Sequence, residues 1–125
     1  NMLRSKKTNI IGVKSAKNHI FKKESLVAKV DKKNQIEKIN YLRKIFNPFG
    51  ELIGINKFSA KTAGNIFSFM NKFFNKKTKL LSWENLMNVY IKKNIDQIFV
   101  LQNQNFPWIN INTVNDYSKA KKLKI

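Results

Sequence analysis

The sequence contains no cysteine, and its only histidine is His19. Disulfides, thiolate zinc sites and cysteine nucleophiles are therefore excluded, and a triad or metal site built on several histidines is nearly excluded as well. No apolar run approaches the roughly 20 residues that a bilayer span requires, and no signal-type segment opens the chain. We therefore expect a cytoplasmic protein with no membrane association.

Acidic residues are also scarce, with 7 Asp+Glu against 25 Lys+Arg and a net charge of +18. Such a charge suggests nucleic-acid binding, but only Arg4 and Arg43 are arginine, the residue that binds phosphate with two parallel hydrogen bonds. Lysine, asparagine and isoleucine, which have A- and T-rich codons, together make 56 of the 125 residues. We therefore attribute most of the charge to composition, and nucleic-acid binding stays open as a less favoured alternative.

With 125 residues, 42% of them hydrophobic, the chain has enough apolar surface for one domain with its own core. Apolar patterns and turn residues predict a hairpin over 25–41 and strands over 52–58, 97–101 and 108–112. They also predict helices after Ser59, from Ser82 and after Thr113. Because strands and helices alternate, we expect an α/β fold with a mainly parallel sheet and helices on its faces.

Three local features sharpen this prediction. The apolar face of the first helix should comprise Ala63, Ile66, Phe67, Met70, Phe73 and Phe74. Gly54 should allow a close approach of another backbone to its strand. Thr113 and Asp116 have the spacing of a capping box at the start of the last helix.

The segment Trp108-Ile109-Asn110-Ile111-Asn112 alternates between polar and apolar residues, apart from the tryptophan. A strand here would place Trp108, Asn110 and Asn112 on one face, at the carboxyl edge of the sheet where open α/β proteins bind ligands. Two amide side chains there could coordinate a hard cation or hold a phosphate, or they could simply satisfy a turn.

The segment 106–120 resembles the closing segment of nucleotidyltransferases that activate sugar phosphates, phosphocholine or phosphonates. That segment has an aromatic residue, a polar strand end and a capped helix. The stretch Gly50-Glu51-Leu52-Ile53-Gly54, followed by Lys57-Phe58-Ser59, resembles the Gly-Glu strand and helix start of cytidylyltransferases of the phosphocholine and phosphonate type. The resemblance covers about residues 24–124.

The resemblance implies a Rossmann-like three-layer α/β sandwich and a Mg²⁺-dependent reaction. A phosphate or phosphonate oxygen would attack the α-phosphorus of a nucleoside triphosphate, with CTP favoured, and pyrophosphate would leave. The family's glycine-rich loop, its Pro-Lys pair and its mid-domain aspartate have no match here. We therefore expect residues 1–125 to form a single incomplete domain, the C-terminal half of such a fold, and to be inactive alone.

The resemblance also assigns roles to residues. Asn112 matches the metal ligand of the closing strand, where phosphocholine-type relatives have aspartate. Asn110 and Glu51 match positions near the acceptor substrate, although Glu51 could instead be a solvated carboxylate at a strand start. Trp108 shares the face of Asn110 and is expected to line the same pocket. No catalytic residue is assigned.

Two other hypotheses stay open beside the transferase: a small lysine-rich nucleic-acid-binding protein and a non-catalytic partner module descended from a transferase. The sequence fixes neither the nucleobase nor the acceptor, which could be phosphocholine, a phosphonate or a sugar phosphate. Apolar surface left by an absent N-terminal half would favour either that half as a partner or self-association.

Overall fold

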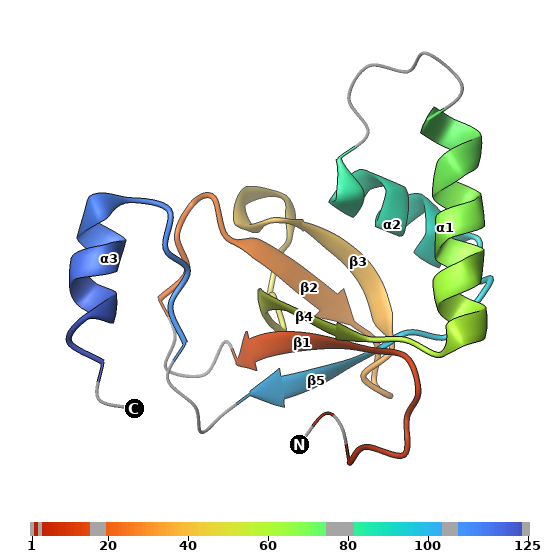
Figure 1. Ribbon diagram of the computed structural model, residues 1–125, viewed down its shortest axis with the longest axis horizontal. Coiled ribbons are helices and arrows are strands. Elements are labelled where there is room, and N and C mark those ends of the chain that lie inside the picture. The colour runs from red at the N-terminus through yellow and green to blue at the C-terminus, as the bar shows by residue number, and fades with distance from the viewer. Residues whose placement is uncertain (1, 3, 16–19, 75–81, 104–107, 124–125) are drawn as a thin grey trace.

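A computed structural model describes residues 2, 4–15, 20–74, 82–103 and 108–123 of the chain (Figure 1). Five strands form one sheet in the order β3-β2-β4-β1-β5. They are β1 (Ile10–Ser15), β2 (Leu26–Val30), β3 (Ile36–Tyr41), β4 (Gly50–Lys57) and β5 (Phe99–Asn103).

The sheet is mixed rather than mainly parallel. Strands β1 and β5 pair in parallel, whereas β1 with β4, β2 with β4 and β2 with β3 are antiparallel. The predicted α/β class is therefore correct, but the predicted strand direction is wrong. One physical reason is connection length, because the turn 31–35 between β2 and β3 is far shorter than the roughly a dozen residues that a parallel crossover needs.

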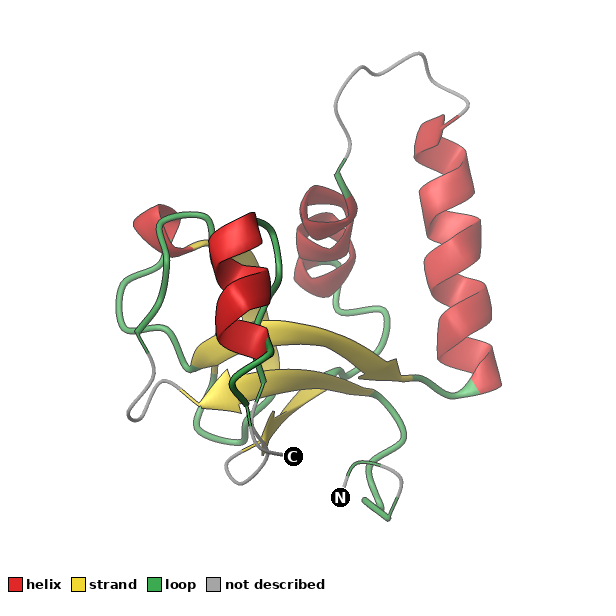
Figure 2. Ribbon diagram, turned by 60° about the vertical axis from the view of Figure 1, so that its left-hand side comes forward, coloured by secondary structure: helices red, strands yellow, loops and turns green. Residues whose placement is uncertain are grey.

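The helices are η1 (Leu42–Lys44), α1 (Ala60–Phe74), α2 (Trp83–Lys92) and α3 (Val114–Ala120). Figures 1 and 2 show α1 and α2 side by side at one end of the molecule, with α3 standing apart from them across the sheet. Among the described residues, no helix combines the length and the apolar character that crossing a membrane would require.

The core lies between one face of the sheet and the pair α1 and α2. Its buried members come from both layers: Ile11, Val13, Ala28, Ile36, Ile39, Ile66, Phe69, Met87, Tyr90, Ile98 and Val100.

On α1, Ile66 and Phe69 are buried while Phe67 is 68% exposed, so the predicted apolar face was partly wrong. Phenylalanines on several sides of this helix make its buried face ambiguous from sequence. The predicted N-cap is confirmed, because the backbone N–H of Thr62 donates to Ser59 Oγ at 3.1 Å.

The predicted hairpin is also confirmed, with β2 and β3 paired antiparallel. Asp31 Oδ1 accepts the backbone N–H groups of Lys33 and Gln35, each at 2.8 Å, and Asn34 adopts the left-handed region at a φ of 60°. An asparagine tolerates this conformation better than most residues do. The turn is fixed by its own side chains, as the sequence indicated.

The close backbone approach expected at Gly54 occurs instead at Gly50, and both glycines lie in β4. A Cβ on Gly50 would lie 2.3 Å from the carbonyl oxygen of Lys14 in β1, so this is the close approach that only glycine allows. Gly54 has open space around it and is instead required by its φ of 77°. The Gly50 contact matters for the site because it presses the start of β4 against β1 beside Glu51.

Helix α2 covers the outer edge of β3 with an amide side chain. Asn88 Oδ1 accepts the backbone N–H of Ile39 at 2.7 Å, and Asn88 Nδ2 donates to the carbonyl oxygen of the same residue. This side chain takes the place of a neighbouring strand, so the edge is not open to another chain at this point.

Replacing Asn88 with alanine should therefore destabilise the protein, because both backbone groups of Ile39 lose their partner. We expect a decrease of about 1–3 kcal/mol in the free energy of unfolding, measured by urea denaturation with circular dichroism. Asn85→Ala is the matched control, since Asn85 is exposed on the same helix. Equal stability of the two variants would contradict the role given to Asn88.

Candidate functional site

A small pocket of about 60 Å³ lies where three distant segments meet. Its lining residues are Ile20 and Lys22 from the loop before β2, Glu51 from β4, and Trp108, Ile109 and Asn110 from the segment before α3. We call this the Glu51 pocket. Glu51 is only 6% exposed and sits in register with Lys14 of β1 and Val27 of β2. It is therefore not a solvated carboxylate at a strand start.

Three of the four residues singled out from the sequence thus come together, namely Glu51, Trp108 and Asn110. The fourth, Asn112, is exposed and is not part of the pocket lining. The predicted segment begins with Phe106 and Pro107, which lie outside the described residues.

The predicted strand over 108–112 is wrong, because these five described residues form no strand and Ile111 is 52% exposed. Alternation produces a strand only where a neighbouring strand accepts its hydrogen bonds. Here the backbone N–H of Asn112 instead donates to Asp116 Oδ2 at 3.2 Å.

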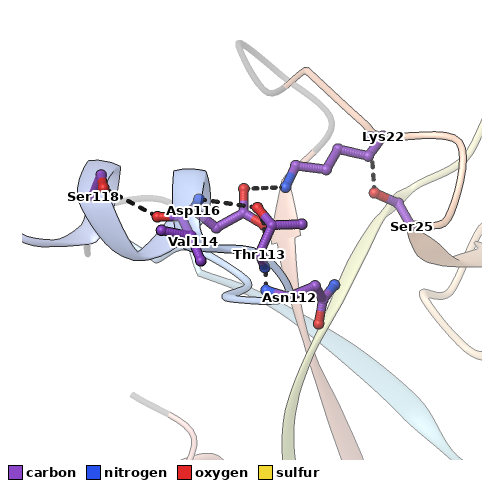
Figure 3. A network of polar contacts seen from close by, with 7 residues as sticks. All are labelled: Lys22, Ser25, Asn112, Thr113, Val114, Asp116 and Ser118. Carbon is purple, nitrogen blue, oxygen red and sulfur yellow. Dashed lines mark hydrogen bonds and ion pairs between the residues drawn. The ribbon is translucent and has the colours of Figure 1, made fainter.

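Asp116, which is 2% exposed, is the centre of the network that holds this segment (Figure 3). Its Oδ2 also accepts the Thr113 hydroxyl at 2.9 Å and the Thr113 backbone N–H at 3.1 Å, and the Asp116 backbone N–H donates to Thr113 Oγ1 at 3.1 Å. The predicted capping box at the start of α3 is therefore confirmed.

The second carboxylate oxygen of Asp116 accepts a hydrogen bond from the ammonium of Lys22 in an ion pair. Lys22 also lines the Glu51 pocket, and its backbone N–H donates to Ser25 Oγ at 2.9 Å. The ion pair thus joins one wall of the pocket, the loop before β2, to the start of α3, which follows the wall formed by residues 108–110. Sequence analysis missed Lys22 because its partner is 94 residues away and lysine pairs are scattered along the whole chain.

The charges of this pair are mutually stabilised. The hydrogen bond from Lys22, followed by that from Thr113, lowers the pKa of Asp116 from 3.8 to about 2. The same hydrogen bond raises the pKa of Lys22 above 10.5. Both groups are therefore charged in the folded protein across the whole neutral range.

The residues around Asn112 offer few free carboxylates to a metal ion. Within the described part of the chain, no group of three or more His, Cys, Asp or Glu side chains could hold a metal ion. Asp116, the carboxylate nearest to Asn112 in the chain, is already bound by Lys22, Thr113 and the Asn112 backbone. Asn112 could offer one neutral amide oxygen, whereas protein-bound Mg²⁺ is usually held by carboxylates and phosphates.

Comparison with solved structures identifies a similar fold. The chain superimposes on a structure of CTP:phosphocholine cytidylyltransferase from Streptococcus pneumoniae (LicC) with a TM-score of 0.61 and 18% sequence identity. The match covers 91% of this chain and 45% of that chain. This confirms the predicted nucleotidyltransferase fold, of which the chain spans less than half. No protein-family model and no curated protein matches the sequence.

The lowered pKa of Asp116 predicts how the pocket responds to acid. Because the folded-state pKa lies below the unfolded value, the stabilisation is fully present above pH 3.8 and is lost as the pH falls through about 2. In a Trp83→Phe background, Trp108 is the only tryptophan left and reports on the segment before α3. Acrylamide quenching of Trp108 should increase as the pH falls through this window.

Asp116→Asn should show increased quenching already at neutral pH and little further change on acidification. Asp31→Asn, in the hairpin turn, is the control and should keep the response of the parent protein. A pH response that is the same with and without Asp116 would show that the ion pair does not hold the segment.

Proposed function

We propose that this chain is the acceptor-binding portion of a Mg²⁺-dependent nucleotidyltransferase. The whole enzyme would join a nucleoside triphosphate, with CTP favoured, to a small phosphorylated acceptor. One observation carries the proposal: Glu51, Trp108 and Asn110, which the resemblance and the sequence assign to an acceptor pocket, line one pocket in a chain with this fold.

Because the charge of Lys22 is paired with Asp116, the remaining lining of the Glu51 pocket favours an acceptor with a cationic group. A buried carboxylate beside an indole attracts an ammonium through charge and through the π face of the ring, and the amide of Asn110 can add a hydrogen bond. Phosphocholine or an aminophosphonate fits this lining better than a sugar phosphate does. Binding there would orient the phosphoryl oxygen for attack on the α-phosphorus, with pyrophosphate as the leaving group.

Two features support the idea that the site is completed by protein outside this chain. A pocket of about 60 Å³ is far smaller than the roughly 300–1,000 Å³ that usually enclose a ligand. Apolar side chains next to it are exposed, with Ile20 at 92% and Val114 at 83%. An N-terminal half, or a second copy of the chain, would cover them. The chain alone should therefore bind acceptor weakly and not turn it over.

Magnesium, when bound, would neutralise charge on the triphosphate. Asn112 is the residue of this chain that we propose to contact the ion, and the remaining ligands would come from the nucleotide and from residues outside this chain. Asn112 would contribute only its amide oxygen, from an exposed position just before α3.

This arrangement predicts that the chain alone has no saturable site for divalent cations at millimolar concentration. Paramagnetic broadening of amide resonances by Mn²⁺ should be weak and unselective, because one neutral ligand cannot replace the water shell of the ion. Asn112→Asp should produce selective broadening around residues 110–114. Saturable binding that survives Asn112→Ala would show that the metal site has been placed wrongly.

Acceptor binding provides the direct test of the proposed function. Phosphocholine should quench Trp108 fluorescence in the Trp83→Phe protein and shift the amide resonances of Glu51 and Asn110, with a dissociation constant in the millimolar range. Glu51→Gln should weaken this binding at least tenfold, about 1.4 kcal/mol.

Glu37→Gln is the matched control, because Glu37 is a half-exposed carboxylate paired with Lys29 at 3.2 Å on β3. It should bind phosphocholine like the parent protein. If phosphocholine, 2-aminoethylphosphonate and glucose 1-phosphate all leave the pocket resonances unchanged, the acceptor role is refuted.

A further inference from the structure

A second pocket, of about 570 Å³, is lined in part by the two residues that follow Lys22 in the chain. It is lined by Lys23 and Glu24 from the loop before β2, by Tyr41 at the end of β3 and by Arg43 on η1. We call it the Arg43 pocket. Among the described residues, the two pockets have no lining residue in common, and the volume of the Arg43 pocket falls in the usual range for a small-molecule site.

Hydrogen bonds fix the walls of the Arg43 pocket and leave the charged groups of Lys23 and Arg43 available to a ligand. The backbone N–H of Leu42 donates to the carbonyl oxygen of Ser25 at 2.9 Å, which joins η1 to the start of β2. The Tyr41 hydroxyl donates to Glu84 on α2 at 3.3 Å, so its ring is held as a wall. Within the described part of the chain, neither Lys23 nor Arg43 forms an ion pair.

The residue type at position 43 is informative because arginine is rare in this chain. Only two of the 25 basic residues are arginine, and one of them lies at this pocket. Guanidinium presents a planar fork of donors that binds two oxygens of one phosphate, whereas an ammonium acts as a point charge.

We propose that the Arg43 pocket binds a small phosphate monoester that also carries hydroxyl groups. Arg43 and Lys23 hold the phosphate, and the carboxylate of Glu24 accepts a hydrogen bond from a hydroxyl. The lining has two cations and one anion, which suits a single phosphate and disfavours the polyanionic backbone of a nucleic acid. This site is independent of the acceptor role proposed for the Glu51 pocket.

Ribose 5-phosphate and inorganic phosphate are suitable probes, titrated into the ¹⁵N-labelled full chain at 150 mM NaCl. Ribose 5-phosphate should give saturable shifts at Lys23, Glu24, Tyr41 and Arg43. Arg43→Gln should weaken binding at least tenfold. Lys44→Gln, which removes the same charge from the same short helix outside the pocket, should change it less than twofold. Glu24→Gln should weaken ribose 5-phosphate but not inorganic phosphate.

Several results would overturn the proposal. Equal losses in Arg43→Gln and Lys44→Gln would show general attraction to a protein of charge +18 rather than a site. Resonance shifts that do not saturate with ribose 5-phosphate would likewise show general attraction rather than a site. Displacement of ribose 5-phosphate from these residues by a single-stranded RNA of far higher affinity would assign the surface to nucleic acid instead. Glu51→Gln should leave ribose 5-phosphate binding unchanged, so this proposal and the acceptor proposal can fail separately.

Discussion

The buried carboxylate of Asp116 is the group on which the candidate site depends. A carboxylate at 2% exposure is costly unless every oxygen is paired, and here Thr113, the Asn112 backbone and Lys22 all donate to it. The position of Glu51 is set by β4, which pairs with β1 on one side and with β2 on the other. Trp108 and Asn110, in contrast, belong to a segment with no strand assignment, so the hydrogen bonds to Asp116 are what fix the end of that segment opposite Glu51.

Features that depend on a few neighbouring residues could be predicted from the sequence. The cap at Ser59, the hairpin turn after β2 and the capping box of Thr113 and Asp116 are each specified within about four residues, and all three were confirmed. The ion pair of Lys22 with Asp116 and the bonds of Asn88 to β3 join residues 94 and 49 positions apart. Nothing local marks either of them, because the partner is chosen by the topology of the sheet.

Composition explains the errors that local rules produced. In a chain with 18 asparagines and 15 isoleucines, polar and apolar residues alternate by chance, and the segment 108–112 alternates without a neighbouring strand to pair with. Ten phenylalanines have a similar effect on α1, where Phe69 is buried and Phe67 is exposed. The role of Glu51 could not be decided for a different reason. Its burial follows from the position of β4 between β1 and β2, a strand order that no local sequence pattern specifies.

The same composition makes the rare residue types the informative ones. Lysine and asparagine are spread along the whole chain and point to no ligand by themselves. The chain has two tryptophans, two arginines and seven acidic residues, and several of these meet around one short segment. On that segment, Lys22 pairs with Asp116 and lines the Glu51 pocket together with Trp108. The next two residues, Lys23 and Glu24, line the Arg43 pocket. Arg43, Glu51 and Trp108 thus line the two pockets for which we propose ligands.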